Sequence, residues 1–279
     1  MYKYLVLALC FALTACGGEE EATEKMVEDA PLNNQLQEKK LIILSKNGIL
    51  LTEFNDFPVF SDAELNLISP KNGKARMGKN DFEFEVKKFP LMTRTAEEDK
   101  TGLKTEKEGQ HIKFIYSGHL PKITNSSAIE ENLSPGENYI FAVLSRSYNL
   151  SVHAAEKGFL MSKISILDNS SKIETAKGSH MVPISPVGEY PYEKSKKILL
   201  DFFLVNTQLS EKGNYVLVTI DDTEFIIRKW APFMIEGLEP GMHSVSFKLM
   251  DASNKLIPGP FNDLGKIEFT LNYKQDLLN

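Results

Sequence analysis

Cysteine is nearly absent from this chain. Only two occur, Cys10 and Cys16, both close to the start of a sequence of 279 residues. A disulfide, a cysteine-based metal site or a cysteine nucleophile is therefore excluded from the body of the chain beyond them. The fold of that body has to be held together by its hydrophobic cores.

Basic residues are also sparse and scattered. Arginine is rare, and the chain carries a formal net charge of −6. The arginines are Arg76, Arg94, Arg146 and Arg228. Because binding to nucleic acid requires a basic face that neutralises phosphates, we expect no nucleic-acid partner.

The first residues of the chain have the pattern of a secretory signal. Residues 5–13 form an unbroken apolar run that follows one positive charge and precedes small residues ahead of Cys16. A run of this length is too short to span a bilayer, which takes about 20 residues. The sequence Leu-Thr-Ala-Cys that ends at Cys16 resembles the lipobox of bacterial lipoproteins. The resemblance implies a signal peptide over residues 1–15, cleavage before Cys16 and a lipid on its sulfur that anchors the chain to a membrane.

An acidic, polar segment follows the lipidation site. Residues 16–40 are rich in glutamate and nearly free of aromatic side chains, so we predict a disordered tether. Acidic residues directly after Cys16 resemble the surface-export signal of Bacteroidota lipoproteins. We therefore expect the protein in the bacterial outer membrane, held by its lipid at the periplasmic face or at the cell surface.

Beyond residue 40 the patterns are those of β-strands. Several segments alternate apolar and polar residues with a period of two: Phe82–Val86, His111–Tyr116, Ser244–Leu249 and Lys266–Leu271. Such alternation is typical of half-buried strands. Residues 41–60 begin with two apolar runs around Lys-Asn-Gly, which predicts a short β-hairpin segment.

The strand patterns occur in two copies. Ile68-Ser-Pro matches Ile184-Ser-Pro, and Glu131-Asn-Leu-Ser-Pro-Gly matches Glu236-Gly-Leu-Glu-Pro-Gly. The first copy is longer by about a dozen residues, and the charged run 93–108 accounts for them as a predicted exposed loop. Two copies of roughly 100 residues, each with several short strands, predict two tandem immunoglobulin-like β-sandwiches in an all-β fold.

Turn signals set the boundaries of the two sandwiches. We assign residues 61–167 to the first sandwich and residues 179–273 to the second. Between them, residues 168–178 are polar and rich in serine and lysine, which is typical of a linker. Because the chain has no Cys…Trp…Cys pattern, the domains are not of the antibody type.

Five short motifs beyond residue 60 together resemble a group of uncharacterised Bacteroidota lipoproteins with tandem Ig-like domains. The motifs are Gly109–Ile112, Leu144–Tyr148, Asp201–Ser210, Lys229-Trp230 and Ile257–Asn262. Some members of that group carry the label phosphopeptide-binding. Histidine is frequent in the group at the positions of Lys113 and Asn149, so a metal role in relatives does not transfer to this chain.

The segment Ser145-Arg146-Ser147-Tyr148 is the strongest candidate for a binding site in the sequence. A guanidinium flanked by two hydroxyls and a phenol could bind a carboxylate or a phosphate in bidentate fashion. The alternative is that the segment caps the end of a strand, with Arg146 paired to a nearby acid and Tyr148 packed. We favour the second interpretation, because one arginine without basic neighbours is a poor phosphopeptide site.

His111 and Trp230 are the remaining candidates for contact with a ligand. Strand alternation puts His111 on the same face as Lys113, whose charge would repel a metal ion, so we predict no metal site there. Trp230, the one tryptophan of the chain, lies between a strand and a loop. It could face a partner or belong to the core, and we favour the core.

No catalytic motif is recognisable in the sequence. It contains no Gly-x-Ser-x-Gly elbow, no phosphate-binding glycine loop and no His-Glu-x-x-His pair, and it indicates no cofactor. We therefore expect no catalytic residue and predict a non-catalytic binding or assembly module that engages another envelope protein. Two alternatives stay open: a binder of a small ligand such as a metal, peptide or glycan, and a hydrolase whose carboxylates meet only in the folded chain.

Overall fold

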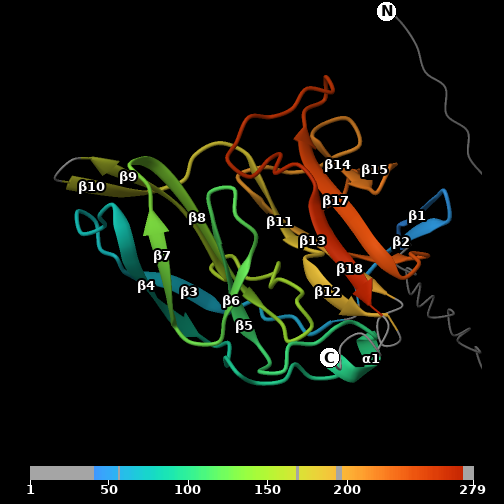
Figure 1. Cartoon of the computed structure of the whole chain (residues 1–279), viewed down its shortest axis with the longest axis horizontal. Helices are drawn as coiled ribbons and strands as arrows, with labels where there is room; N and C mark the ends of the chain where they lie inside the picture. Colours follow the sequence, from blue (N-terminus) through green and yellow to red (C-terminus); the bar gives the residue numbers. More distant parts are fainter. Residues whose placement is uncertain (1–40, 56, 168–169, 193–196, 273–279) are drawn as a thin grey trace, which may run out of the picture. The chain divides into compact units, whose positions relative to one another are not determined.

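Strands make up most of the structure, a computed structural model that describes residues 41–55, 57–167, 170–192 and 197–272 (Figure 1). Within these ranges it contains eighteen strands and one helical turn, α1 (Glu98–Thr101). The predicted signal peptide, the lipid anchor at Cys16 and the tether lie outside the described residues. No helix in the described ranges is long and apolar enough to cross a membrane.

The first immunoglobulin-like sandwich joins a three-stranded and a five-stranded sheet. The smaller sheet has the strand order β3-β4-β7, and the larger sheet has the order β10-β9-β8-β5-β6. The strands are β3 (Glu64–Ser69), β4 (Gly78–Lys87), β5 (His111–Tyr116), β6 (Lys122–Thr124), β7 (Ala128–Leu133), β8 (Gly136–Ser145), β9 (Phe159–Leu167) and β10 (Ser170–Thr175). Phe82 and Phe84 on β4 meet Phe114 on β5 in the core between the sheets.

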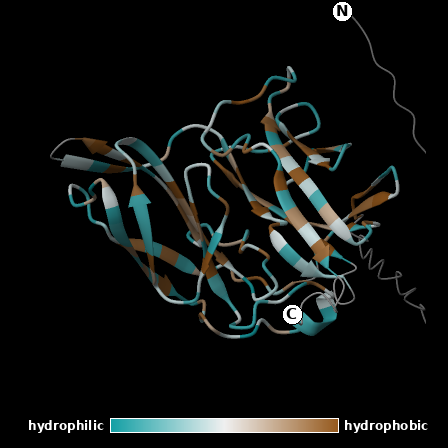
Figure 2. Ribbon diagram, in the orientation of Figure 1, coloured by the Kyte–Doolittle hydropathy of each residue, from teal (hydrophilic) through white to brown (hydrophobic). Residues whose placement is uncertain are grey.

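The second sandwich joins two five-stranded sheets. Their strand orders are β1-β2-β16-β13-β11 and β12-β18-β17-β14-β15. The strands are β1 (Ile43–Lys46), β2 (Ile49–Glu53), β11 (His180–Ser185), β12 (Gly188–Pro191), β13 (Ile198–Val205), β14 (Tyr215–Ile220), β15 (Thr223–Ile227), β16 (Phe233–Glu236), β17 (Gly241–Met250) and β18 (Ile267–Asn272). Along β17 the buried Val245, Phe247 and Leu249 alternate with more polar, partly exposed residues, and Figure 2 shows this alternation as bands along the strand.

The two sandwiches repeat the same topology, so the prediction of tandem Ig-like sandwiches is confirmed. In the first sandwich β4 lies between β3 and β7, and in the second β13 lies between β11 and β16. Strands β7 and β16 are equivalent, since each comes directly before the Pro-Gly turn of its copy. Both first strands also shift register near the Ile-Ser-Pro motif, between Leu67 and Ser69 and between Pro183 and Ser185. The motif match in the sequence therefore corresponds to equivalent positions in the fold.

The predicted linker over residues 168–178 is wrong for residues 170–175. They form β10, which pairs antiparallel with β9 at the edge of the first sandwich. The polar, Ser/Lys-rich composition does not indicate a strand, because an exposed edge strand needs few apolar side chains. Its backbone groups still pair with the neighbouring strand.

The predicted hairpin over residues 41–60 is present as β1 and β2, but it does not stand alone. Strand β2 pairs with β16, so the hairpin extends a sheet of the second sandwich although it precedes the first in sequence. Ile49 and Leu51 enter the core of that sandwich. Burial of these two side chains is the physical reason why the hairpin docks there.

The sandwiches pack on one another face to face. Every residue of β5 and of β13 is buried, because one side of each strand faces its own core and the other side faces the neighbouring sandwich. At the interface Phe141 of β8 lies 5.4 Å from Phe203 of β13, measured between ring centroids. Val143, Met161, Val182 and Phe261 belong to the same buried cluster.

Candidate functional site

The predicted binding segment Ser145–Tyr148 lies inside the molecule, at the edge of this interface. All four side chains are buried. Arg146 donates through Nε to the Pro58 carbonyl at 3.0 Å and through Nη1 to the Ser151 carbonyl at 2.7 Å. Its guanidinium also stacks on the ring of Phe57 at 4.8 Å. Arg146 thus fixes the stretch 57–60 through main-chain carbonyls and an aromatic ring. The acidic partner that we expected for Arg146 is therefore wrong.

The predicted exposed loop over residues 93–108 is confirmed only in part: many of its side chains are exposed, but the loop also packs on the same segment. Thr95 and Glu98 are buried. The backbone N–H of Ser147 donates to Oγ1 of Thr95 at 3.0 Å, and the Ser147 hydroxyl donates to the Glu98 carboxylate. A charged run without apolar periodicity can therefore be fixed by polar contacts that a sequence pattern does not reveal.

A buried carboxylate joins the two sandwiches. Asp201 on β13 is fully buried, and its Oδ2 accepts a hydrogen bond of 2.9 Å from the backbone N–H of Ser151 in the first sandwich. Its Oδ1 lies 2.7 Å from Nε2 of His153. Burial raises the pKa of Asp201, but the charge of His153 and the hydrogen bonds from His153 and Ser151 outweigh it, so the pKa lies below the usual value.

Trp230 covers this contact between His153 and Asp201. Its ring stacks on His153 with centroids 4.9 Å apart, and its edge contacts Phe203 at 5.0 Å. Its indole N–H donates to the Phe202 carbonyl at 2.9 Å. Trp230 is partly buried and packs against the cores of the second sandwich and of the interface, so it belongs mainly to the internal packing.

His111 and Lys113 share one face of β5, as strand alternation requires, and this face points to the second sandwich. Nδ1 of His111 lies 2.9 Å from the Gly109 carbonyl, while Nε2 has no hydrogen-bonding partner among the described residues. Burial, with the charge of Lys113, lowers the pKa of His111 to about 4. Lys113 itself donates from Nζ to the backbone carbonyl of Asn149 at 3.1 Å. The two positions at which the chain departs from the resembled motifs are therefore in contact.

Asn262, from the last of the five motifs, has the same kind of role. Its Oδ1 accepts from the backbone N–H of Met181 at 2.8 Å, and its Nδ2 donates to the Ser179 carbonyl at 2.9 Å. These bonds hold the loop before β18 against the start of β11. The predicted site residues and the motifs around them thus converge on the junction between the sandwiches, where Tyr148 also borders a cavity of about 470 Å³.

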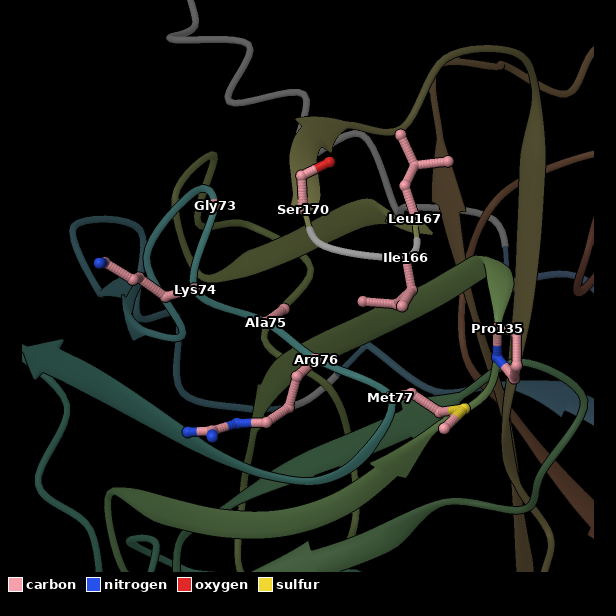
Figure 3. A pocket seen from close by; sticks show the side chains of 9 residues that line it. All are labelled: Gly73, Lys74, Ala75, Arg76, Met77, Pro135, Ile166, Leu167 and Ser170. Atoms are coloured by element: carbon pink, nitrogen blue, oxygen red, sulfur yellow. The ribbon is translucent and has the colours of Figure 1, made fainter.

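The largest described cavity lies elsewhere, at one end of the first sandwich (Figure 3). It has a volume of about 540 Å³ and is bordered by the loop 73–77, Pro135 and the end of β9. In Figure 3 the charged ends of Lys74 and Arg76 point away from Ile166. Its lining is mixed, with polar groups beside the apolar side chains of Met77, Ile166 and Leu167, and its size falls in the range of small-ligand sites. No group of three or more potential metal ligands occurs in the described part of the chain.

Sequence reasoning missed Asp201 and His153, the polar centre of the junction. A signal was available for the first of them. Asp201 is the single charged residue in the otherwise apolar strand Ile198–Val205. A carboxylate in such a run must be buried, and a buried charge needs a partner. The position of His153 gives no comparable signal, because it lies in an irregular segment.

Comparison with known proteins adds little to this description. No family model and no curated protein matches the chain. Several solved structures show distant similarity, among them the following two. Fibronectin(III)-like modules of Clostridium thermocellum CbhA share 11% identity over 76% of this chain and 95% of that chain, with a TM-score of 0.26. The Bacteroides ovatus mixed-linkage glucan utilization locus protein SGBP-B, in complex with a heptasaccharide, shares 7% identity over 75% of this chain and 71% of that chain, with a TM-score of 0.22.

Proposed function

We propose that the protein is an outer-membrane lipoprotein that acts as a non-catalytic binding or assembly module. Lipid on Cys16 would hold it to the membrane, and the tether would separate the sandwiches from the bilayer. The observation that supports this proposal is the junction around Asp201, which fixes the two sandwiches to one another. Two domains held in a constant arrangement present their outer loops and sheet edges to a partner in one geometry, which lowers the entropy lost on binding.

Because the conspicuous polar residues are used within the junction, contacts with a partner must come from outer surfaces. Exposed apolar side chains mark three such places in different parts of the fold. Ile43 on β1, Met77 beside the cavity and Met242 on β17 are each at least 60% exposed. They provide positions at which a partner can be detected without disturbing the core.

Site-specific photo-crosslinking tests the proposal. The full lipidated chain would carry a photoreactive residue at position 43, 77 or 242 in its own membrane, and the adducts would be identified by mass spectrometry. We expect one protein neighbour to recur at one position and to be missing at the others. If all three positions give only unlinked, monodisperse protein, the assembly proposal is refuted.

The cavity in Figure 3 supports a second candidate, the binding of a small ligand such as a peptide or a glycan. A ligand that binds only the folded state raises the melting temperature. Leu167, which borders the cavity and is 62% exposed, can be replaced in the variant Leu167→Glu, and Leu120→Glu is a matched control at an exposed leucine elsewhere. A panel of peptides and glycans should then stabilise the wild type and the control but not L167E. A flat response of the wild type would exclude this function.

A further inference from the structure

A second, much smaller cavity lies beside the junction, next to Lys113. It has a volume of about 50 Å³ and is mostly enclosed. Lys113, Asn149 and Glu106 all line it. Lys104 closes one side, since its ammonium lies 5.4 Å from the ring centroid of Tyr190 in the second sandwich. An amine, an amide and a carboxylate thus face the same small space.

Hydrogen bonds link these three residues in series, through the backbone carbonyl of Asn149 on one side and its side-chain amide on the other. Lys113 donates from Nζ to the backbone carbonyl of Asn149 at 3.1 Å. The side-chain amide of Asn149 donates from Nδ2 to Oε1 of Glu106 at 2.8 Å. The carboxylate therefore already touches the nitrogen that would leave if the amide were attacked, and the lysine amine is held against the same asparagine.

The state of Lys113 suits a nucleophile. Its side chain is almost completely buried, and its hydrogen bond in the described structure goes to a carbonyl oxygen in place of a carboxylate. Burial lowers the pKa of Lys113 to about 8, although the charges of Asp201 and Glu106 act in the opposite direction. About a tenth of the amine is therefore neutral at pH 7, far more than for an ordinary lysine, and the neutral amine is the form that attacks a carbonyl carbon.

We propose that Lys113 and Asn149 become joined by an intramolecular isopeptide bond, with Glu106 as the proton carrier. Nζ of Lys113 forms a bond to Cγ of Asn149, and the bond between Cγ and Nδ2 breaks. Glu106 takes the proton that the attacking nitrogen loses and passes it to Nδ2, which leaves as ammonia. The carboxylate ends as it began, and the reaction consumes no oxidant, reductant or other co-reactant.

The cavity favours this reaction in two ways. Lys113 and Asn149 both line it, and the lysine amine is hydrogen-bonded to the backbone of the asparagine whose side chain it would attack, so that an otherwise slow attack becomes intramolecular. Its volume also exceeds the roughly 10–15 Å³ that one water-sized molecule requires, which leaves room for the departing ammonia. The bond would tie β5 to the turn after β8 at the junction. This inference is independent of the ligand or partner of the protein.

Peptide mass spectrometry of the full wild-type chain, purified from its membrane, tests the proposal directly. We expect a tryptic product in which the segment around Lys113 is joined to the segment around Asn149, lighter than their sum by one molecule of ammonia. Recovery of the two segments unlinked, with trypsin cleavage at Lys113, would overturn the proposal. This measurement needs no variant to fold.

Three variants refine the test. Lys113→Arg keeps the positive charge but cannot form the amide, and Glu106→Gln removes the proton carrier, so both should lack the linked peptide. Lys163→Arg, a change on the neighbouring strand β9, should retain it. Loss of the cross-link should also lower the Tm by roughly 5–10 °C, as expected for a closed loop of this length. A linked peptide in Lys113→Arg would show that another lysine reacts and would refute the assignment.

Discussion

Replacement of Asp201 by alanine should show how much the junction contributes to the free energy of unfolding, apart from the two hydrophobic cores. The change leaves the backbone N–H of Ser151 and the ring of His153 without their shared acceptor. It also removes a negative charge that acts on the buried side chains of Lys113 and Arg146. A hydrogen bond to a charged group typically contributes about 1.5–3 kcal/mol to the free energy of unfolding, so we expect the loss of these two to cost about 3–6 kcal/mol.

The variant Asp201→Asn should be affected less. Its side-chain carbonyl can still accept the bond from Ser151, so the expected loss is about 1–3 kcal/mol. Asp62→Ala provides the control, because Asp62 is largely exposed and forms only a surface pair with Lys88. That substitution should change the free energy of unfolding by less than about 1 kcal/mol.

Urea unfolding followed by tryptophan emission is the appropriate assay. Trp230 is the only tryptophan and stacks on His153, so its emission reports the junction, while far-UV circular dichroism reports both sandwiches. In the wild type we expect the two signals to change together, because the contacts of Asp201 with Ser151 and His153 couple the two sandwiches. In Asp201→Ala the tryptophan transition should move to lower urea concentration, ahead of part of the dichroism change.

The dependence on pH gives a second check of the same reasoning. The pKa of Asp201 is lowered in the folded protein, so its contribution is fully present above the unfolded pKa and is lost as the pH falls through the folded pKa. The difference between the wild type and Asp201→Asn should therefore be largest above about pH 4 and should shrink below it. If Asp201→Ala lies within about 1 kcal/mol of the wild type at pH 7, the junction is not held by this pair.

Further predictions concern the other buried polar groups and the anchor. The pKa of His111 lies at about 4, below its unfolded value, so the wild type should lose roughly 3 kcal/mol through this group between pH 7 and pH 4. In His111→Asn, which lacks the titrating imidazole, the free energy of unfolding measured in urea should fall by about 3 kcal/mol less than in the wild type between pH 7 and pH 4. Arg146→Lys cannot reproduce the forked bonds to Pro58 and Ser151 and should cost about 2–4 kcal/mol by the same assay, whereas an unchanged midpoint would contradict the assigned role. Trp230→Phe loses the bond to the Phe202 carbonyl and should cost about 1–2 kcal/mol, measured by circular dichroism. Cys16→Ser should move the protein from the membrane to the soluble fraction, and retention in the membrane after cell fractionation would argue against a lipid anchor.

Much of the fold was accessible from the sequence, because strand formation depends on local alternation. The period of two in Phe82–Val86 and in Ser244–Leu249 locates strands that the structure contains as parts of β4 and β17. The repeated Ile-Ser-Pro and Pro-Gly motifs correctly indicate two copies of one topology. The apolar run of β13 likewise indicates a strand that is covered on both faces.

Strand partners could not be obtained in the same way. The pairing of β2 with β16 joins segments separated by most of the chain, and nothing in residues 49–53 specifies that partner. The polar edge strand β10 was mistaken for a linker for a related reason. Its hydrogen bonds are made by the backbone, which is the same in every residue, so composition carries little information about them.

The role of the Ser145–Tyr148 segment depended on tertiary structure alone. From the sequence, Arg146 is a cation that could bind an anionic ligand or cap a strand, and both interpretations are chemically reasonable. In the fold it meets the Pro58 carbonyl, eighty-eight positions away in the chain, and stacks on Phe57. The sequence by itself determined which segments become strands, that the sandwich unit is repeated and which polar residues are unusual. Only the tertiary structure decided that those residues are enclosed between two sandwiches, because a side chain's burial and partners are set by surfaces that distant segments bring together.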